Sequence, residues 1–266
     1  MILQALSASH RGVAAASRTA LTLGNPAFES RAKPAPSAVT LAVANVPLGK
    51  RFLDSGEALP PLPFAGEESH NVQATFQQVF GADNVVGLVG RDATEGRLRQ
   101  EIEKHHFAYI HLATHGFVDE GVFNLFGAIM LAPPKVGGRA NPTDDGELRL
   151  YEIPGLKLTG CELAVLSACQ TNVGPARPME TGSTFARAFL SAGVRRVVSS
   201  QWSVADQSTA ELIEPFFKTV VDSLDRPGTR LNYARALQSA RKGIRNDPKW
   251  SAPCFWAPFV LVGPAE

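Results

Sequence analysis

The chain of 266 residues has few cysteines, little net charge and no long apolar run, and each scarcity excludes a class of protein. Its three cysteines, Cys161, Cys169 and Cys254, are too few and odd in number for a secreted disulfide framework, which predicts a reducing, cytoplasmic compartment. A net charge of +1 supplies no global field that would attract nucleic acid. No apolar run approaches the roughly 20 residues of a membrane-spanning helix. The sequence therefore predicts a soluble protein with neither nucleic acid nor membrane as a partner.

The N-terminal end differs in composition from the rest of the chain. Its first 28 residues contain two arginines, several serines and alanines, and no acidic residue. This composition loosely resembles an organelle transit peptide. It also fits a flexible extension or the remnant of an upstream region, which is the interpretation that we favour for residues 1–18. Residues 19–266 then form one large domain with ample material for a core.

Two short stretches each combine a buried strand with a reactive residue. The runs 109–112 and 163–166 are nearly all apolar, which is typical of strands buried on both faces of a parallel sheet. The first run leads to His115, which is followed by Gly116, and the second leads to Cys169. Because sites in open α/β sheets form at the carboxyl ends of the strands, we expect His115 and Cys169 to meet at one edge of the sheet.

An imidazole beside a thiol is the minimal apparatus for a cysteine nucleophile, since the base removes the thiol proton before attack. We therefore predict that Cys169 attacks a carbonyl carbon, and that His115 acts first as general base and then as general acid. Cys161 and Cys254 lack such surroundings. Both are expected to be buried and to pack as small apolar side chains.

Four histidines within eleven positions raise the alternative of a metal site: His105, His106, His111 and His115. A strand sends alternate side chains to opposite faces, and no CxxC or HExxH spacing accompanies these residues. We therefore expect neither a metal ion nor another cofactor.

The residues around the histidine and the cysteine resemble the CHAT domain, a caspase-like cysteine peptidase family related to separase. The paired motifs are His-Leu-Ala-Thr-His-Gly at 111–116 and Leu-Ser-Ala-Cys-Gln-Thr at 166–171. The resemblance runs in order over residues 62–263, and its further segments lie at 145–153, 186–193, 197–204 and 255–263. It implies a caspase-like three-layer α/β sandwich, in which a mostly parallel central sheet is flanked by helices.

The resemblance also implies a role for individual residues. His115 and Cys169 would form a catalytic dyad, and His111 would be a strand residue rather than the base. The main-chain N–H groups of Gly116 and Cys169 would donate to the oxyanion. The implied activity is hydrolysis of a peptide bond in a protein or peptide substrate. It requires no cofactor, and no third catalytic residue is evident.

The segment from Ser199 to Asp206 is the candidate for substrate binding. An exposed backbone edge that includes Gln201 would pair with an extended peptide, and Trp202 would wall a side-chain pocket. Asp206 offers negative charge for an arginine or lysine immediately before the scissile bond, as a nearby acid does in separase. The same residue stands where a helix N-cap belongs, so both roles stay open.

Strand and helix patterns alternate along the chain, as right-handed parallel crossovers require. The first strand is either 19–25 or 39–46, and the family's usual Gly-Asn-Pro-like turn favours the former, which makes 32–61 an insertion. The long stretch 117–160 is expected to hold one strand, at 128–131, and a mobile flap. Helices are expected at 67–80, 92–104, 182–192, 206–224 and 229–245, and further strands at 84–89, 194–200 and 259–262.

Two other classes of function remain. A non-catalytic or partner-activated regulatory module could use the same fold, since relatives often carry helical repeats that recruit partner proteins, although no repeat is visible here. A cysteine amidase or glutaminase generally places its cysteine in a Gly-x-Cys-x-Gly elbow, with the histidine later in the chain. Here Ala168 and Gln170 flank the cysteine and the histidine comes first, which disfavours the amidase.

Overall fold

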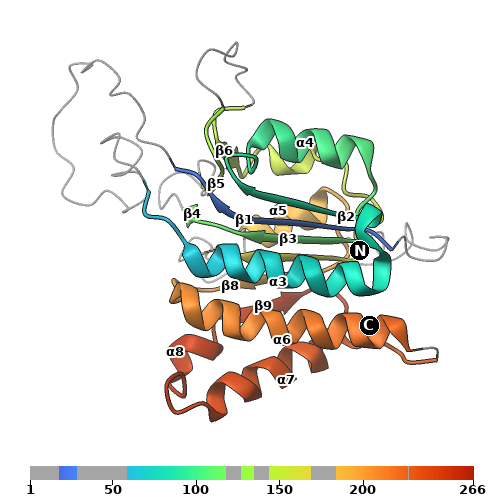
Figure 1. Cartoon of the computed structure of the whole chain (residues 1–266), viewed down its shortest axis with the longest axis vertical. Helices are drawn as coiled ribbons and strands as arrows, with labels where there is room; N and C mark the ends of the chain where they lie inside the picture. Colours follow the sequence, from blue (N-terminus) through green and yellow to red (C-terminus); the bar gives the residue numbers. More distant parts are fainter. Residues whose placement is uncertain (1–17, 29–58, 118–126, 135–143, 169–183, 227) are drawn as a thin grey trace, which may run out of the picture.

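The computed structural model of the chain describes residues 18–28, 59–117, 127–134, 144–168, 184–226 and 228–266. Its centre is a six-stranded sheet in the order β2-β1-β3-β7-β8-β9 (Figure 1). Neighbouring strands are parallel except β8 and β9, which are antiparallel. The strands are β1 (Ala20–Pro26), β2 (Val85–Gly90), β3 (Tyr109–Ala113), β7 (Leu163–Ser167), β8 (Val197–Ser200) and β9 (Phe259–Val262).

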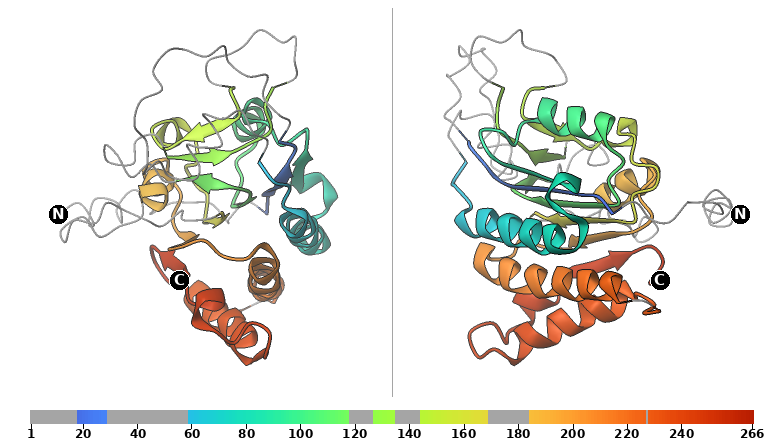
Figure 2. Two further views of the ribbon diagram at one scale, coloured as in Figure 1. Left: turned by 90° about the vertical axis from the view of Figure 1, so that its left-hand side faces the viewer. Right: turned by 45° about the vertical axis from the view of Figure 1, so that its right-hand side comes forward.

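Helices cover both faces of this sheet, which makes three layers (Figures 1 and 2). Helices α3 and α6 lie side by side on one face, α4 and α5 lie on the other, and α7 packs outside α6. The bounds are α3 (Pro63–Phe80), α4 (Glu95–Lys104), α5 (Thr184–Ser191), α6 (Asp206–Asp225), α7 (Tyr233–Asn246) and the short α8 (Pro253–Trp256). The predicted mostly parallel sheet between helices is confirmed.

A second, three-stranded antiparallel sheet lies in the connection between β3 and β7. It consists of β4 (Gly116–Phe117), β5 (Ala128–Met130) and β6 (Glu147–Arg149). Only β5 was predicted, from the apolar run at 128–131; β4 and β6 have two and three residues and lie in no such run. The stretches 118–126 and 135–143, on which the predicted flap falls, lie outside the described residues.

The apolar runs of the sequence follow from burial on both faces of the sheet. In β3, Tyr109 packs in the core beneath α3 and α6, and the next residue, Ile110, packs in the core on the side of α4 and α5. Every residue of β3 and β7 is buried, so neither strand shows the alternation of a half-exposed strand.

The structure resolves one choice and corrects three helix starts. The run 19–25 forms β1 at the centre of the sheet, whereas the alternative 39–46 lies outside the described residues. Helix α3 begins at Pro63 rather than Glu67, because proline is well suited to the first position of a helix. Helix α4 begins three residues later than predicted because its N-cap is Thr94, whose hydroxyl oxygen accepts the Arg97 N–H at 3.1 Å. Helix α7 begins at Tyr233 rather than Thr229, because its N-cap is Asn232, whose Oδ1 accepts the Arg235 N–H at 2.8 Å.

Helix α3 approaches the sheet closely at Gly24 of β1. A Cβ atom at this position would lie 2.6 Å from the carbonyl oxygen of Ala65 and would overlap the Cβ of Ser69. A residue without a side chain therefore lets α3 come this near to β1. The contact sets the height of the N-terminal half of α3 over the sheet.

We expect Gly24→Ala to lower the free energy of unfolding by about 1–3 kcal/mol, because the added methyl group overpacks this contact. The control is Gly243→Ala on the exposed side of α7, where a Cβ meets nothing within 4 Å. Alanine there should raise the stability by up to about 1 kcal/mol through helix propensity. Urea unfolding followed by circular dichroism measures both changes, and an unchanged midpoint for Gly24→Ala would contradict the close packing of α3.

Candidate functional site

The carboxyl ends of β3 and β7 meet at one edge of the sheet. Ala113 pairs with Ser167 in the parallel ladder, so that His115 and Ala168 follow strand ends at the same level. Cys169, the predicted nucleophile, lies outside the described residues. That Cys169 lies close to His115 therefore stays a prediction. The structure does describe Ala168, the residue before it.

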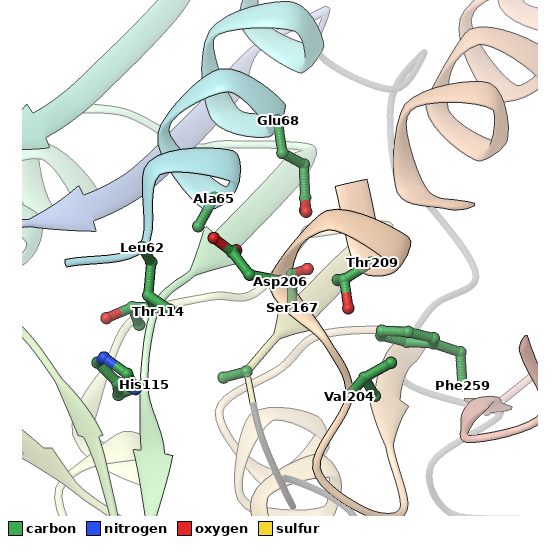
Figure 3. Close-up of a pocket in the computed structure, with 11 residues that line it drawn as sticks. Leu62, Ala65, Glu68, Thr114, His115, Ser167, Val204, Asp206, Thr209 and Phe259 are labelled. Carbon is green, nitrogen blue, oxygen red and sulfur yellow. The ribbon is translucent and has the colours of Figure 1, made fainter. Parts of the chain in front are cut away.

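A pocket with a volume of about 80 Å³ opens between these strand ends and the N-terminal ends of α3 and α6 (Figure 3). His115 and Ala168 line it from the strand ends, Glu68 lines it from α3, and Asp206 lines it from α6. The predicted base, the neighbour of the predicted nucleophile and the predicted acidic residue thus share one pocket.

The main chain holds the side chain of His115. Its Nε2 lies 2.9 Å from the carbonyl oxygen of Pro60, in the extended stretch that leads into α3. Because a carbonyl oxygen only accepts, Nε2 carries the hydrogen and Nδ1 keeps a free lone pair. Sequence reasoning missed Pro60, since any residue can supply a main-chain carbonyl and the contact leaves no signal in the residue type.

Aromatic rings remove water from around His115. The ring of Phe28 lies 5.3 Å from the imidazole between centroids, and that of Phe117 stacks on it at 6.4 Å. Desolvation lowers the pKa of His115 below the ordinary value of 6.5, and the hydrogen bond with Pro60 opposes this effect only in part. The imidazole is therefore mostly neutral at pH 7, the form that can accept a proton.

The main-chain N–H of Gly116 points away from the small sheet. The N–H of Met130 donates to the carbonyl of His115 at 2.8 Å, so these two residues form a hydrogen-bonded pair of the antiparallel ladder. The next pair, Gly116 and Ile129, is then the non-hydrogen-bonded kind, whose N–H groups point outward. Such an N–H beside His115 is suited to donate to an oxyanion.

Asp206 is the first residue of α6, but its carboxylate caps a different helix. Its Oδ2 accepts the main-chain N–H of Phe64 at 3.0 Å, at the start of α3. Burial raises the pKa of Asp206, and the charge of Glu68 acts in the same direction, while the hydrogen bond from Phe64 opposes both. The N-cap role expected of Asp206 in its own helix is wrong, since the N-cap of α6 is Ala205. The carboxylate caps α3 instead and also lines the pocket, and its role toward a substrate stays a prediction.

A buried acid–imidazole pair lies at the inner end of the pocket. Glu68 is 0% exposed, and its Oε1 lies 2.6 Å from Nε2 of His111 in β3. In the part of the chain that the structure describes, Glu68 Oε2 and His111 Nδ1 have no hydrogen-bond partner. The sequence carried a signal for this pair, because Glu68 stands one turn before Val72 on the apolar face of its helix, where a charge is unusual.

Part of the predicted substrate-binding segment is already hydrogen-bonded within the protein and cannot pair with a peptide. The N–H of Gln201 donates to the carbonyl of Pro258 at 3.0 Å, which extends the β8–β9 pairing and occupies this edge of the backbone. Trp202 is 38% exposed, and its Nε1 donates to the carbonyl of Cys254 at 3.1 Å. The stretch from Trp202 to Val204 has no regular secondary structure, so it is the part that an extended peptide could still reach.

Neither of the other two cysteines lines the pocket. Cys161 is buried, and burial raises its pKa to about 12. Cys254 is exposed, so its predicted burial is wrong, because the unpredicted helix α8 carries it on the surface. Among the described residues, no three His, Cys, Asp or Glu side chains are placed to hold a metal ion. No helix in the same part of the chain is both long and apolar enough to cross a membrane.

Solved structures share this architecture. The chain is similar to the Arg-specific cysteine proteinase gingipain R (RgpB), with a TM-score of 0.57 and 11% identity over 93% of this chain and 46% of that chain. A complex of the Porphyromonas gingivalis RgpB pro- and mature domains has a TM-score of 0.55 and 10% identity, and the match covers 93% of this chain and 47% of that chain. The Drosophila initiator caspase Dronc has a TM-score of 0.45 and 10% identity, and the match covers 95% of this chain and 82% of that chain. At these identities the gingipain structures show a shared fold, and the predicted α/β class, with a mostly parallel sheet between helices, is confirmed.

Sequence comparison extends beyond the fold. Human tetratricopeptide repeat protein 28 is 24% identical over an alignment of 233 residues, and the match covers 76% of this chain. The chain spans only 8% of the length of that relative. The CHAT domain family matches residues 2–264, which include both strand-end motifs. The chain therefore belongs to the CHAT domain family.

Proposed function

We propose that the chain is a cysteine endopeptidase in which Cys169 is the nucleophile and His115 the general base. The observation that carries the proposal is the state of His115. Its Nε2 is fixed by the Pro60 carbonyl, its Nδ1 is left unprotonated in the neutral ring, and it shares a pocket with Ala168, the residue before the cysteine. Membership of the CHAT family, and a fold shared with a structure described as a cysteine proteinase, support it.

In this reaction, Nδ1 of His115 takes the thiol proton of Cys169, and the sulfur attacks the carbonyl carbon of the scissile peptide bond. The N–H groups of Gly116 and Cys169 donate to the oxyanion of the tetrahedral intermediate. The protonated imidazole then gives its proton to the leaving amine as the C–N bond breaks, which leaves a thioester. A water molecule, deprotonated by His115, hydrolyses the thioester and restores the thiol.

The pocket supplies the specificity in this proposal. A substrate residue whose carbonyl carbon lies beside His115 would direct its side chain into the pocket, where Asp206 offers negative charge. A basic residue before the scissile bond is therefore the preferred substrate. Trp202 would form one wall of the cleft, and the stretch from Trp202 to Val204 would lie along the peptide.

Replacement of the dyad residues tests the activity. We expect Cys169→Ala to abolish cleavage of fluorogenic peptides and His115→Ala to lower kcat/KM by about 10²–10⁴, the usual contribution of general acid–base catalysis. Asp206→Ala should lower kcat/KM selectively for peptides with arginine or lysine before the scissile bond.

Matched controls are available for both dyad residues. Cys254→Ala removes an exposed thiol, and His70→Ala removes an exposed imidazole on α3, so both variants should cleave as the unchanged chain does. Cleavage that persists in Cys169→Ala would refute the proposed nucleophile. Equal losses for basic and neutral peptides in Asp206→Ala would remove Asp206 from the pocket role.

The environment of His115 predicts the pH dependence. Because desolvation lowers the pKa of His115, its neutral form persists to pH values below 6.5, and the acidic limb of kcat/KM should lie below that value. Phe28→Ala admits water, so it should move the limb upward toward the ordinary histidine value. An NMR titration of the His115 ring in Cys169→Ala measures the pKa directly. A value above 6.5, or no upward shift in Phe28→Ala, would contradict the role of desolvation.

The alternative is a regulatory module activated by, or acting through, a partner. One observation favours it: the human relative is named for tetratricopeptide repeats, and this chain spans 8% of its length. A regulatory protein or a helical-repeat region would then be the partner. Absence of turnover by every form of the chain, together with no labelling of Cys169 by a thiol-directed peptide probe, would favour the module.

A further inference from the structure

We propose that Glu68 determines specificity, because it gives the pocket a second, deeper carboxylate that selects a guanidinium group over an ammonium group. The inference rests on the proposed function for its place in a reaction. The binding of a cation that it describes needs no turnover, so the two can be tested apart.

The first observation is the arrangement of the Glu68 carboxylate. His111 holds Oε1 at 2.6 Å, which fixes the orientation of the group. Oε2 is fully buried and, among the residues that the structure describes, has no hydrogen-bond partner. Glu68 lines the pocket, and Figure 3 shows its carboxylate directed toward the space beside Asp206 and Thr209. A buried carboxylate oxygen without a donor is unfavourable, and a donor-rich ligand would satisfy it.

The second observation is that other acceptors face the same space from different elements. Asp206 contributes its carboxylate from α6. Ser167, at the end of β7, is also buried, lines the pocket and has a hydroxyl without a partner among the described residues. Three elements thus present oxygen atoms to one small volume.

The third observation is the balance of charge. Two carboxylates line the pocket, and no lysine or arginine is among the described residues that line it. Its remaining titratable residue, His115, is mostly neutral at pH 7, because desolvation lowers its pKa. The imidazole of His111 contacts Glu68 only at Oε1, so a cationic side chain from a substrate would be bound at the unpartnered Oε2 and at Asp206.

Geometry favours a guanidinium group. Arginine presents five N–H donors in a rigid plane, whereas lysine presents three from a single atom. A planar donor set can reach Glu68 Oε2 and Asp206 together, while an ammonium group has fewer donors for oxygen atoms on separate elements. The pocket volume of about 80 Å³ is several times the roughly 10–15 Å³ that one water molecule requires, which leaves room for the four heavy atoms of a guanidinium.

The test measures binding in Cys169→Ala, which cannot turn over. The probes are Nα-acetyl-arginine amide, Nα-acetyl-lysine amide and Nα-acetyl-citrulline amide, a neutral analogue of arginine, each titrated by NMR. The arginine amide should bind at least tenfold more tightly than the citrulline amide, and several-fold more tightly than the lysine amide. Adding Glu68→Gln should weaken binding of the arginine amide about tenfold or more, as for loss of a charge-assisted hydrogen bond.

Glutamine is the informative replacement at Glu68, since its oxygen can still accept from His111 while the charge is lost. The matched control is Glu67→Gln, the exposed neighbour on the same helix, which should bind all three amides unchanged. If Glu68→Gln does not fold, the comparison of the three amides in Cys169→Ala still decides. Equal affinity for the arginine and citrulline amides, or for the arginine and lysine amides, would overturn the inference.

Kinetics separate this inference from the proposed function. In an active chain, Glu68→Gln should lower kcat/KM about 10- to 100-fold for peptides with arginine before the scissile bond, and little for peptides with a neutral residue there. Glu68-dependent binding of the arginine amide without turnover in any form would support the pocket and contradict the peptidase. Turnover of arginine peptides that is equal in Glu68→Gln and Glu67→Gln would support the peptidase and overturn the role of Glu68.

Discussion

The parallel pairing of β3 with β7 is the constraint on which the rest of the site depends. Ala113 stands opposite Ser167, so the two strands end at the same level, and His115 and Ala168 line one pocket. Parallel strands can align their carboxyl ends in this way only when crossover connections return each chain to the same end of the sheet. Because both strands are buried on both faces, a register slip would place apolar side chains into different cores at high cost. The position of His115 is therefore as well determined as the core itself.

Helix α3 converts that strand edge into a pocket. Its close approach at Gly24 sets its height, and the Asp206 carboxylate fixes its first turn by accepting the Phe64 N–H. The extended residues before it supply the Pro60 carbonyl that orients His115, and its second turn carries Glu68 to His111. One helix therefore orients the base, closes the pocket and supplies an acid. A displacement of α3 should affect all three, so the packing of a glycine in the core bears on the chemistry at the edge.

The sheet, the helices on its faces and the edge that holds His115 could be predicted, because buried strands and amphipathic helices leave patterns that depend on residue type. What could not be predicted depends on groups that every residue has, or on elements too short to show a period. The Pro60 carbonyl is of the first kind. The strands β4 and β6 and the helix α8, which exposes Cys254, are of the second. Glu68 is a third case. Its charge on an apolar helix face is visible in the sequence, but its partner His111 could be identified only from the structure.

The distribution of unpaired polar atoms also points to this end of the molecule. Within the described part of the chain, eight buried side-chain atoms have no hydrogen-bond partner. Five of them belong to Glu68 and Ser69 of α3 and to Thr22, His111 and Ser167 on the sheet, and the other three belong to Glu95, Ser199 and Arg241. An unpaired buried polar atom costs about 1–3 kcal/mol, and an apolar residue of similar shape would avoid that cost at positions such as Thr22. A core selected for stability alone would have no reason to collect such atoms beneath one helix. Two of these atoms, Glu68 Oε2 and Ser167 Oγ, belong to residues that line the pocket, and groups that are left unsatisfied in the free protein retain their full capacity for a ligand.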